Sequence, residues 1–122
     1  MEREPIVVLV TGDRDWNNYD SIRTELEKLP SGSAVVHGAC RGADRIAGEI
    51  AEELGLEPRP YPADWRRYRG GAGPIRNQQM LDEEPEISLV LAFHPDLTKS
   101  KGTKDMVERS EKAGKPVRRI KA

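Results

Sequence analysis

Aromatic residues, cysteine and long apolar runs are scarce in this sequence of 122 residues. Its apolar runs have the length of strands, as in Ile6–Val10, and fall far short of the ~20 residues that a membrane-spanning helix needs. The lone cysteine, Cys40, has no partner for an internal disulfide. With only His37 and His94 beside it, a four-ligand zinc site would need several carboxylates. We therefore expect no membrane partner, no metal and no resident cofactor.

Charge is nearly balanced overall but unevenly placed along the chain. Twenty basic and 21 acidic residues give a net charge of -1, which offers nucleic acid no general attraction. Residues 98–122 carry nine basic and three acidic side chains, a pattern typical of the solvated face of an amphipathic helix. The first residues lead straight into Ile6–Val10, without the basic start and long apolar centre of a secretory signal, so we expect a cytoplasmic protein.

Two strand–helix units are predicted in the first half of the chain. Ile6–Val10 is a continuous apolar run rich in β-branched residues, which is typical of a strand buried on both faces of a parallel sheet. A helix that stops before Pro30 follows it, with Asp20 or Ser21 as the N-cap. The pattern repeats with a strand at Ala34–Val36 and a helix whose apolar stripe consists of Ile46, Ala47, Ile50, Ala51 and Leu54.

The second half continues the alternation of strands and helices. Glu57–Pro62 holds three prolines, which lack a backbone donor, so an edge strand is predicted there. Residues 63–73 are predicted to be a loop rich in Arg and Gly. The later elements are a helix from Pro74 through Leu81, a buried strand at Ile87–Phe93, a helix from Gly102 to Gly114 and an edge strand at Val117–Ile120.

Five strands that alternate with four helices predict an α/β fold, a three-layer sandwich around a mostly parallel five-stranded sheet. We expect the strand order 3-2-1-4-5. Internal repeats and low-complexity tracts are absent from the sequence, and no boundary divides it. Residues 1–122 are therefore expected to form a single domain.

In an open parallel sheet, ligands bind outside the carboxyl ends of the strands. The loops at these ends are Thr11–Trp16, His37–Asp44 and Phe93–Thr103. Each contains glycine beside a polar or cationic residue, and such loops present main-chain N–H groups and helix N-termini to phosphate. The residues concerned are Gly12, Arg14, Gly38, Arg41, Gly42, Gly102 and Thr103. The strict Gly-x-Gly-x-x-Gly and Gly-x-x-x-x-Gly-Lys-Ser/Thr patterns are absent, which disfavours a Rossmann dehydrogenase and a P-loop NTPase.

Five separated motifs agree in order and spacing with a known family. They are Val10–Trp16, His37–Asp44, Tyr61–Trp65, Gly73–Asn77 and the pair Gly102–Thr103. In this order they resemble the YspA-like branch of the SLOG (Smf/DprA–Lonely-guy) superfamily. The resemblance implies a Rossmann-like domain that binds a nucleotide-derived ligand, such as ADP-ribose or a nucleoside monophosphate. It also implies self-association into a homodimer or a higher homo-oligomer.

Relatives in the superfamily suggest an enzyme as an alternative. The Lonely-guy phosphoribohydrolases hydrolyse the N-glycosidic bond of nucleoside monophosphates with an Arg and a Glu, and Arg76 resembles the former. The position of the glutamate falls at Met106, which cannot act as an acid or base, with Asp105 one residue earlier. An N-glycosidase would therefore depend on Arg76 and Asp105.

The remaining candidate residues have more than one interpretation. Asp44 either accepts a hydrogen bond from a ribose hydroxyl or caps the helix that follows it. Arg76 faces either the pocket or solvent, and Asn77 beside it is a further candidate for ligand binding. A base would lie toward Trp16, Trp65 or Phe93. The stretch Trp65–Gly71 interleaves aromatic and cationic residues, which is typical of single-stranded nucleic-acid binders, of a lid that stacks on a bound base, or of a mobile loop.

Overall fold

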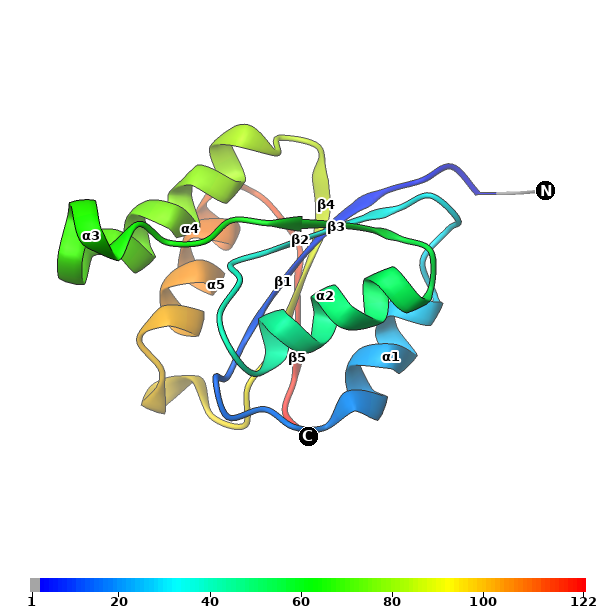
Figure 1. The fold of residues 1–122 in the computed structure, drawn as a ribbon, viewed down its shortest axis with the longest axis horizontal. Coiled ribbons are helices and arrows are strands. Elements are labelled where there is room, and N and C mark those ends of the chain that lie inside the picture. Colours follow the sequence, from blue (N-terminus) through cyan, green and yellow to red (C-terminus); the bar gives the residue numbers. More distant parts are fainter. Residues whose placement is uncertain (1–2) are drawn as a thin grey trace.

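Five parallel strands form one sheet in the order β3-β2-β1-β4-β5, which confirms the predicted topology (Figure 1). In the computed structural model, which describes residues 3–122, all four strand pairs are parallel. The strands are β1 (Val7–Gly12), β2 (Ala34–His37), β3 (Glu57–Pro60), β4 (Ile87–Phe93) and β5 (Val117–Ile120).

Helices cover both faces of the sheet. They are α1 (Tyr19–Glu27), α2 (Ala43–Glu53), α3 (Trp65–Tyr68), α4 (Ala72–Glu83) and α5 (Gly102–Lys112), with short 3-10 turns η1 (Arg69–Gly71) and η2 (Leu97–Lys99). Helices α1 and α2 pack together on one face, and α4 and α5 pack together on the other (Figure 1). None of the helices in the described part of the chain has the length and apolar character needed to cross a membrane.

Two local predictions need correction. The segment 63–73 is not a loop throughout, because it contains α3, η1 and the first turn of α4. Asp64 Oδ1 accepts a hydrogen bond from Arg67 N at 3.1 Å and so caps α3, a four-residue helix too short to show a periodic pattern. The N-cap of α1 is Asn18, whose Oδ1 accepts from Ser21 N at 3.2 Å, and not Asp20 or Ser21.

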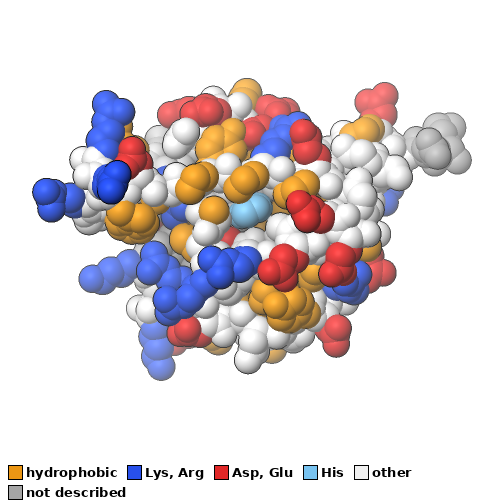
Figure 2. Space-filling view, in the orientation of Figure 1, with side chains coloured by type: hydrophobic (Ala, Val, Ile, Leu, Met, Phe, Trp, Pro, Cys, Tyr) orange, Lys and Arg blue, Asp and Glu red, His pale blue; other side chains and the backbone are white. Residues whose placement is uncertain are grey.

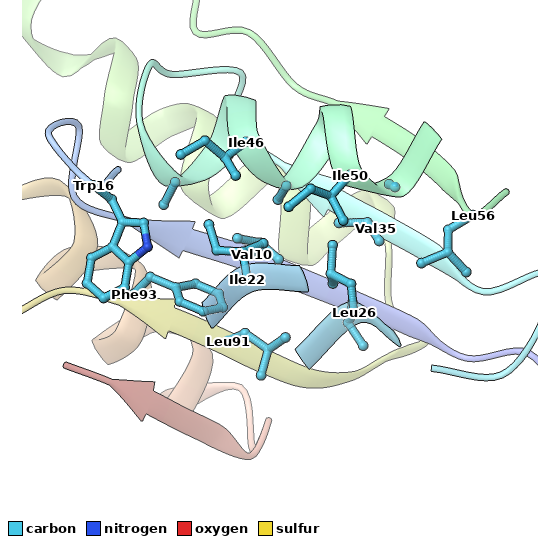
Figure 3. Packing of buried hydrophobic residues seen from close by; sticks show 14 residues of the cluster. Val10, Trp16, Ile22, Leu26, Val35, Ile46, Ile50, Leu56, Leu91 and Phe93 are labelled. Atoms are coloured by element: carbon cyan, nitrogen blue, oxygen red, sulfur yellow. The ribbon is translucent and has the colours of Figure 1, made fainter. Parts of the chain in front are cut away.

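The central strands β1 and β4 contribute buried residues to the hydrophobic core on each face of the sheet. Val8 and Val10 of β1 pack among residues of α1 and α2, as Figure 3 shows for Val10. Leu9 packs with Met80 of α4 and Met106 of α5 on the opposite face. All three β1 side chains are fully buried. The continuous apolar run therefore reflects burial on both faces, as the sequence predicts.

The edge strand β3 is protected by its prolines. Glu57 N donates to Ser33 O at 3.0 Å and Tyr61 N donates to His37 O at 2.8 Å, so the N–H groups of alternate residues point toward β2. Pro58 and Pro60 occupy the intervening positions, which face the open edge and carry no N–H. This edge lacks the donors with which a further strand would pair.

Candidate functional site

Three loops and one helix surround a hollow of about 430 Å³ at the carboxyl edge of the sheet. The register pairs Val10 with His37 and Gly12 with Phe93, so the ends of β1, β2 and β4 lie side by side. The predicted site residues that line this hollow are Gly12, Arg14, Arg41, Asp44, Arg76, Gly102 and Thr103. The structure thus brings together residues that lie up to 91 positions apart in the sequence.

The hollow is predominantly cationic. Arg14, Lys99 and Lys101 line it and form no ion pair with any residue from 3 to 122. Arg41 lies 3.5 Å from Asp15, and both side chains are well exposed, so this pair contributes little to stability. The lysines follow β4 in the polar loop that the sequence singles out, although neither was predicted as a site residue. Figure 2 shows Lys and Arg side chains gathered on the side of the molecule that carries α3.

The N-terminus of α5 opens onto this hollow. Ser100 Oγ accepts hydrogen bonds from Thr103 N at 3.0 Å and from Lys104 N at 3.3 Å, which satisfies two of the free donors of the helix. Gly102, the first residue of α5, has open space where a Cβ would stand, with no described atom within 4 Å. A ligand atom can therefore approach the main chain at Gly102 without meeting a side chain.

Three main-chain N–H groups of the loop between β2 and α2 donate to nearby side chains. Asp44 Oδ2 accepts from Gly38 N at 3.0 Å and from Cys40 N at 3.4 Å, and His37 Nδ1 accepts from Ala39 N at 3.0 Å. The prediction that Gly38 presents its N–H to phosphate therefore needs correction. A side chain at Gly38 would place Cβ 2.6 Å from Arg76 Nη1, so glycine is required there for packing.

Gly42 is also explained by packing and backbone conformation. Its φ of +77° lies in the left-handed region, and a Cβ there would stand 2.3 Å from Asp13 O. Ala43 N donates to the same Asp13 oxygen at 3.1 Å. Glycine at this position thus lets the β1–α1 loop rest on the N-terminus of α2.

Arg76 of α4 is a buried residue that donates hydrogen bonds to the chain segments that follow β2 and β3. Only 7% of this residue is exposed. Its guanidinium donates to the main-chain oxygens of Gly38 and Tyr61, the latter at 3.3 Å, and its Nε donates to Asn77 Oδ1 at 3.0 Å. Arg76 therefore places a positive charge in the wall of the site and also holds the β2–α2 loop in place.

Two buried groups near Arg76 have displaced pKa values. Burial raises the pKa of Asp44 to about 6, although the N–H groups of Cys40 and Gly38 and the charges of Arg76 and Arg14 act to lower it. Burial and the charge of Arg76 lower the pKa of His37 to about 4. At neutral pH, Asp44 is mostly ionised and His37 is neutral.

A second hollow of about 390 Å³ continues from the first. Arg14, Cys40, Arg41 and Arg76 line both, so we treat the two hollows as one cleft. The far end of this cleft is formed by the apolar and aromatic residues Ala39, Pro62, Ala63 and Trp65. Trp65 is 49% exposed and therefore leaves a large part of its ring free for contact.

Two aromatic residues predicted near the ligand lie in the core instead. Phe93 is fully buried and Trp16 is 8% exposed. Their ring centroids lie 5.6 Å apart in an edge-to-face arrangement (Figure 3). The expectation that a base contacts Phe93 is wrong, because its side chain has no exposed surface. Trp16 does not line the cleft either.

Asp105 and Asn77 do not line the cleft. Asn77 Nδ2 donates to Asp105 Oδ2 at 3.0 Å, and Arg109 Nε donates to the same oxygen at 2.8 Å. Met106 is fully buried in the core. No carboxylate of α5 among the described residues lines the cleft beside Arg76, so the structure does not bring Arg76 and Asp105 together there.

An open parallel sheet with this strand order and a cleft at its carboxyl edge define a Rossmann-like α/β protein. A family model described as the YspA, cpYpsA-related SLOG family matches residues 6–68. The Gene 61 protein of Mycobacterium phage D29 is 35% identical over 119 residues, an alignment that covers 90% of this chain and 92% of that protein. The chain belongs to the YspA, cpYpsA-related SLOG family.

A solved structure shares the fold. The X-ray structure of DNA processing protein A (DprA) from Streptococcus pneumoniae superposes with a TM-score of 0.71 at 17% sequence identity. The match covers 95% of this chain and 50% of that chain. The chain therefore has the fold of one half of the larger protein.

Proposed function

We propose that this protein binds a nucleotide-derived small molecule, such as a nucleoside monophosphate or ADP-ribose. The observation that carries the proposal is the shared wall of the two hollows, in which Arg14, Cys40, Arg41 and Arg76 separate a cationic end from an apolar and aromatic end. A nucleotide has the same division, with anionic phosphate at one end and a flat base at the other. Each hollow has the volume of a small-molecule site.

The phosphate would occupy the cationic end. Arg14, Lys99 and Lys101 supply positive charge there, and the N-terminus of the eleven-residue helix α5 adds about half a charge. The open space at Gly102 gives an anion access to the main chain. Because the N–H groups of Gly38, Ala39 and Cys40 are already occupied, the phosphate would be held mainly by the cationic side chains and by the N-terminus of α5.

The base would lie against Trp65 at the other end of the cleft. Pro62 and Ala39 complete an apolar surface around this ring. Stacking of a base on an aromatic ring contributes about 1–3 kcal/mol and is available to every base.

A thermal-shift series with AMP, ADP, ADP-ribose and cyclic AMP tests the proposal. A ligand present at 100 times its dissociation constant should stabilise the protein by about 2.7 kcal/mol. The double variant Lys99→Ala/Lys101→Ala should lose most of this stabilisation. The matched control Lys112→Ala/Lys121→Ala, which removes two exposed lysines elsewhere, should keep it. The absence of a shift with every nucleotide would refute the proposal.

A second candidate function is single-stranded nucleic-acid binding by the segment Trp65–Arg69. Its specific support is the Arg67 guanidinium, which lies 5.1 Å from the centre of the exposed Tyr68 ring, with Arg66 and Arg69 exposed beside it. Such a surface would hold stacked bases and track phosphates. Fluorescence anisotropy of a labelled oligothymidylate at increasing salt tests it, and binding retained after all three arginines are changed to Gln would remove this candidate.

A further inference from the structure

Asp44 is a buried carboxylate that presents one free oxygen to the cleft. The residue is 6% exposed and lines the cationic hollow. Both of its hydrogen bonds, from Gly38 N and Cys40 N, are made by Oδ2. Oδ1 accepts no hydrogen bond from residues 3–122. Because every fully buried side-chain oxygen in this range has a partner, Oδ1 is not fully buried. Oδ1 is therefore the part of Asp44 that is accessible from the cleft.

Hydrogen bonding to the β2–α2 loop does not by itself require a carboxylate with a second, free oxygen. Organising the β2–α2 loop takes one acceptor oxygen, which a neutral Asn or Ser would also supply without a buried charge. The charges of Arg76 and Arg14 act on Asp44 and offset part of the cost of desolvating its carboxylate. Besides balancing the buried charge of Arg76, the carboxylate supplies a second, strong acceptor on the wall of the cleft.

The position of Asp44 relative to the two ends of the cleft indicates what it accepts. Its hydrogen-bond partner Cys40 and its neighbour Arg76 both line the wall that the two hollows share. In a nucleotide, the sugar lies between phosphate and base. An anionic phosphate would be repelled by Asp44, whereas a sugar hydroxyl can donate to it.

We propose that Asp44 Oδ1 accepts hydrogen bonds from the vicinal hydroxyls of a ribose, so that the site selects ribonucleotides over deoxyribonucleotides. This inference rests on the proposed nucleotide-binding function and names the sugar that the site takes. The selection follows from the cost of leaving a desolvated carboxylate oxygen without a donor when the hydroxyl is missing. Because Asp44 is mostly ionised at neutral pH, both of its oxygens are acceptors there.

Calorimetric titration at pH 7.5 with AMP, 2′-deoxy-AMP, 3′-deoxy-AMP and 2′,3′-dideoxy-AMP tests the inference. A hydrogen bond to a charged group corresponds to about tenfold or more in affinity, so the dideoxy nucleotide should bind at least tenfold more weakly than AMP. In Asp44→Asn the amide oxygen can still accept from Gly38 N and Cys40 N, while its NH₂ group faces the cleft. The preference for AMP should then fall to about threefold or less.

Asp15→Asn is the matched control, because it removes an exposed carboxylate from the rim of the same hollow. It should change the affinity for all four nucleotides by the same factor. Equal affinity of the wild-type protein for all four would overturn the inference, even if Asp44→Asn does not fold, and would leave the proposed function standing. An unchanged preference in folded Asp44→Asn would also overturn it. If neither AMP nor ADP-ribose binds, the proposed function fails and the inference fails with it.

Discussion

The guanidinium group of Arg76, on α4, donates to the main-chain oxygen of Gly38 at the carboxyl end of β2. A helix on one face of the sheet thus holds a loop that leads to a helix on the other face. The same guanidinium faces the buried carboxylate Asp44, which orders that loop through Gly38 N and Cys40 N. The shape of the cleft therefore depends on two buried groups of opposite charge that hydrogen-bond to the same loop.

Replacing Arg76 should destabilise the fold before it affects any ligand. In Arg76→Ala, Asp44 stays buried without its main cationic neighbour, and the free energy of unfolding should fall by about 3 kcal/mol or more. Urea denaturation followed by circular dichroism measures this change. Arg66→Ala, at an exposed position on α3, should change stability by less than about 0.5 kcal/mol. Equal stability of the two variants would contradict the structural role of Arg76.

Two glycines of the cleft should respond differently to alanine. A Cβ at Gly12 would stand 2.5 Å from Phe93 O and 2.6 Å from Ala43 Cβ, so Gly12→Ala should cost about 1–3 kcal/mol of stability. Gly102→Ala meets open space at the start of a helix, so its stability should be unchanged or raised by up to about 1 kcal/mol. Its affinity for AMP should nevertheless fall, because the methyl group occupies the approach to α5. Thermal unfolding and calorimetric titration of both variants provide the comparison.

The free energy of unfolding should depend on pH through two buried groups, Asp44 and His37, whose contributions change in opposite directions. The pKa of Asp44 is raised from 3.8 to about 6, so between these values the folded chain keeps a proton that the unfolded chain loses. Its contribution to the free energy of unfolding therefore falls as pH rises, by up to about 1.4 kcal/mol per pH unit. The pKa of His37 is lowered from 6.5 to about 4, so the unfolded chain holds the extra proton and this contribution rises with pH.

Single variants separate the two contributions. From pH 4 to pH 6, the stability of Asp44→Asn relative to wild type should increase with pH. The relative stability of His37→Asn, whose Oδ1 can replace Nδ1 as the acceptor from Ala39 N, should decrease over the same range. Urea denaturation at half-unit steps of pH supplies both difference curves. A flat curve for either variant would show that its group is not perturbed as described.

Trp65→Ala should distinguish recognition of the base from recognition of the phosphate. Loss of stacking should weaken AMP binding by about 1–3 kcal/mol, whereas the affinity for inorganic pyrophosphate should change little. Because the side chain is half exposed, the free energy of unfolding should stay within about 0.5 kcal/mol of wild type. Calorimetric titration with both ligands measures the difference. An equal loss for both would assign Trp65 a role in the shape of the cleft and not in stacking.

The sequence predicts the sheet and the place of the cleft well, because both follow from local patterns and general topology. Ile6–Val10 is apolar throughout and Ile87–Phe93 is apolar except for Ser88, so they occupy the centre of the sheet. The three prolines of Glu57–Pro62 exclude that segment from the centre. Once the strands are parallel, the loops at their carboxyl ends converge.

Individual site residues are harder to predict, because their partners are distant in sequence. The N–H groups of the β2–α2 loop bind Asp44 and His37, and Gly38 is fixed by contact with Arg76, 38 positions away. An aromatic residue at a strand end can turn toward the core or the cleft, and Phe93 turns toward the core. Lys99 is the last residue of η2 and Lys101 follows shortly after it, and no periodic pattern indicates the conformation of this short turn.

Nuclear magnetic resonance titration of the ¹⁵N-labelled protein with AMP tests the central claim most directly, because it reports at once whether a nucleotide binds and where. Saturable shifts should appear at the main-chain amides of Arg14, Lys101 and Gly102 and at the indole N–H of Trp65, on opposite ends of the cleft. The indole N–H of Trp16, which donates to Asn18 O in the core, should move little. No shifts up to millimolar AMP and ADP-ribose, or shifts confined to residues outside the cleft, would contradict the account.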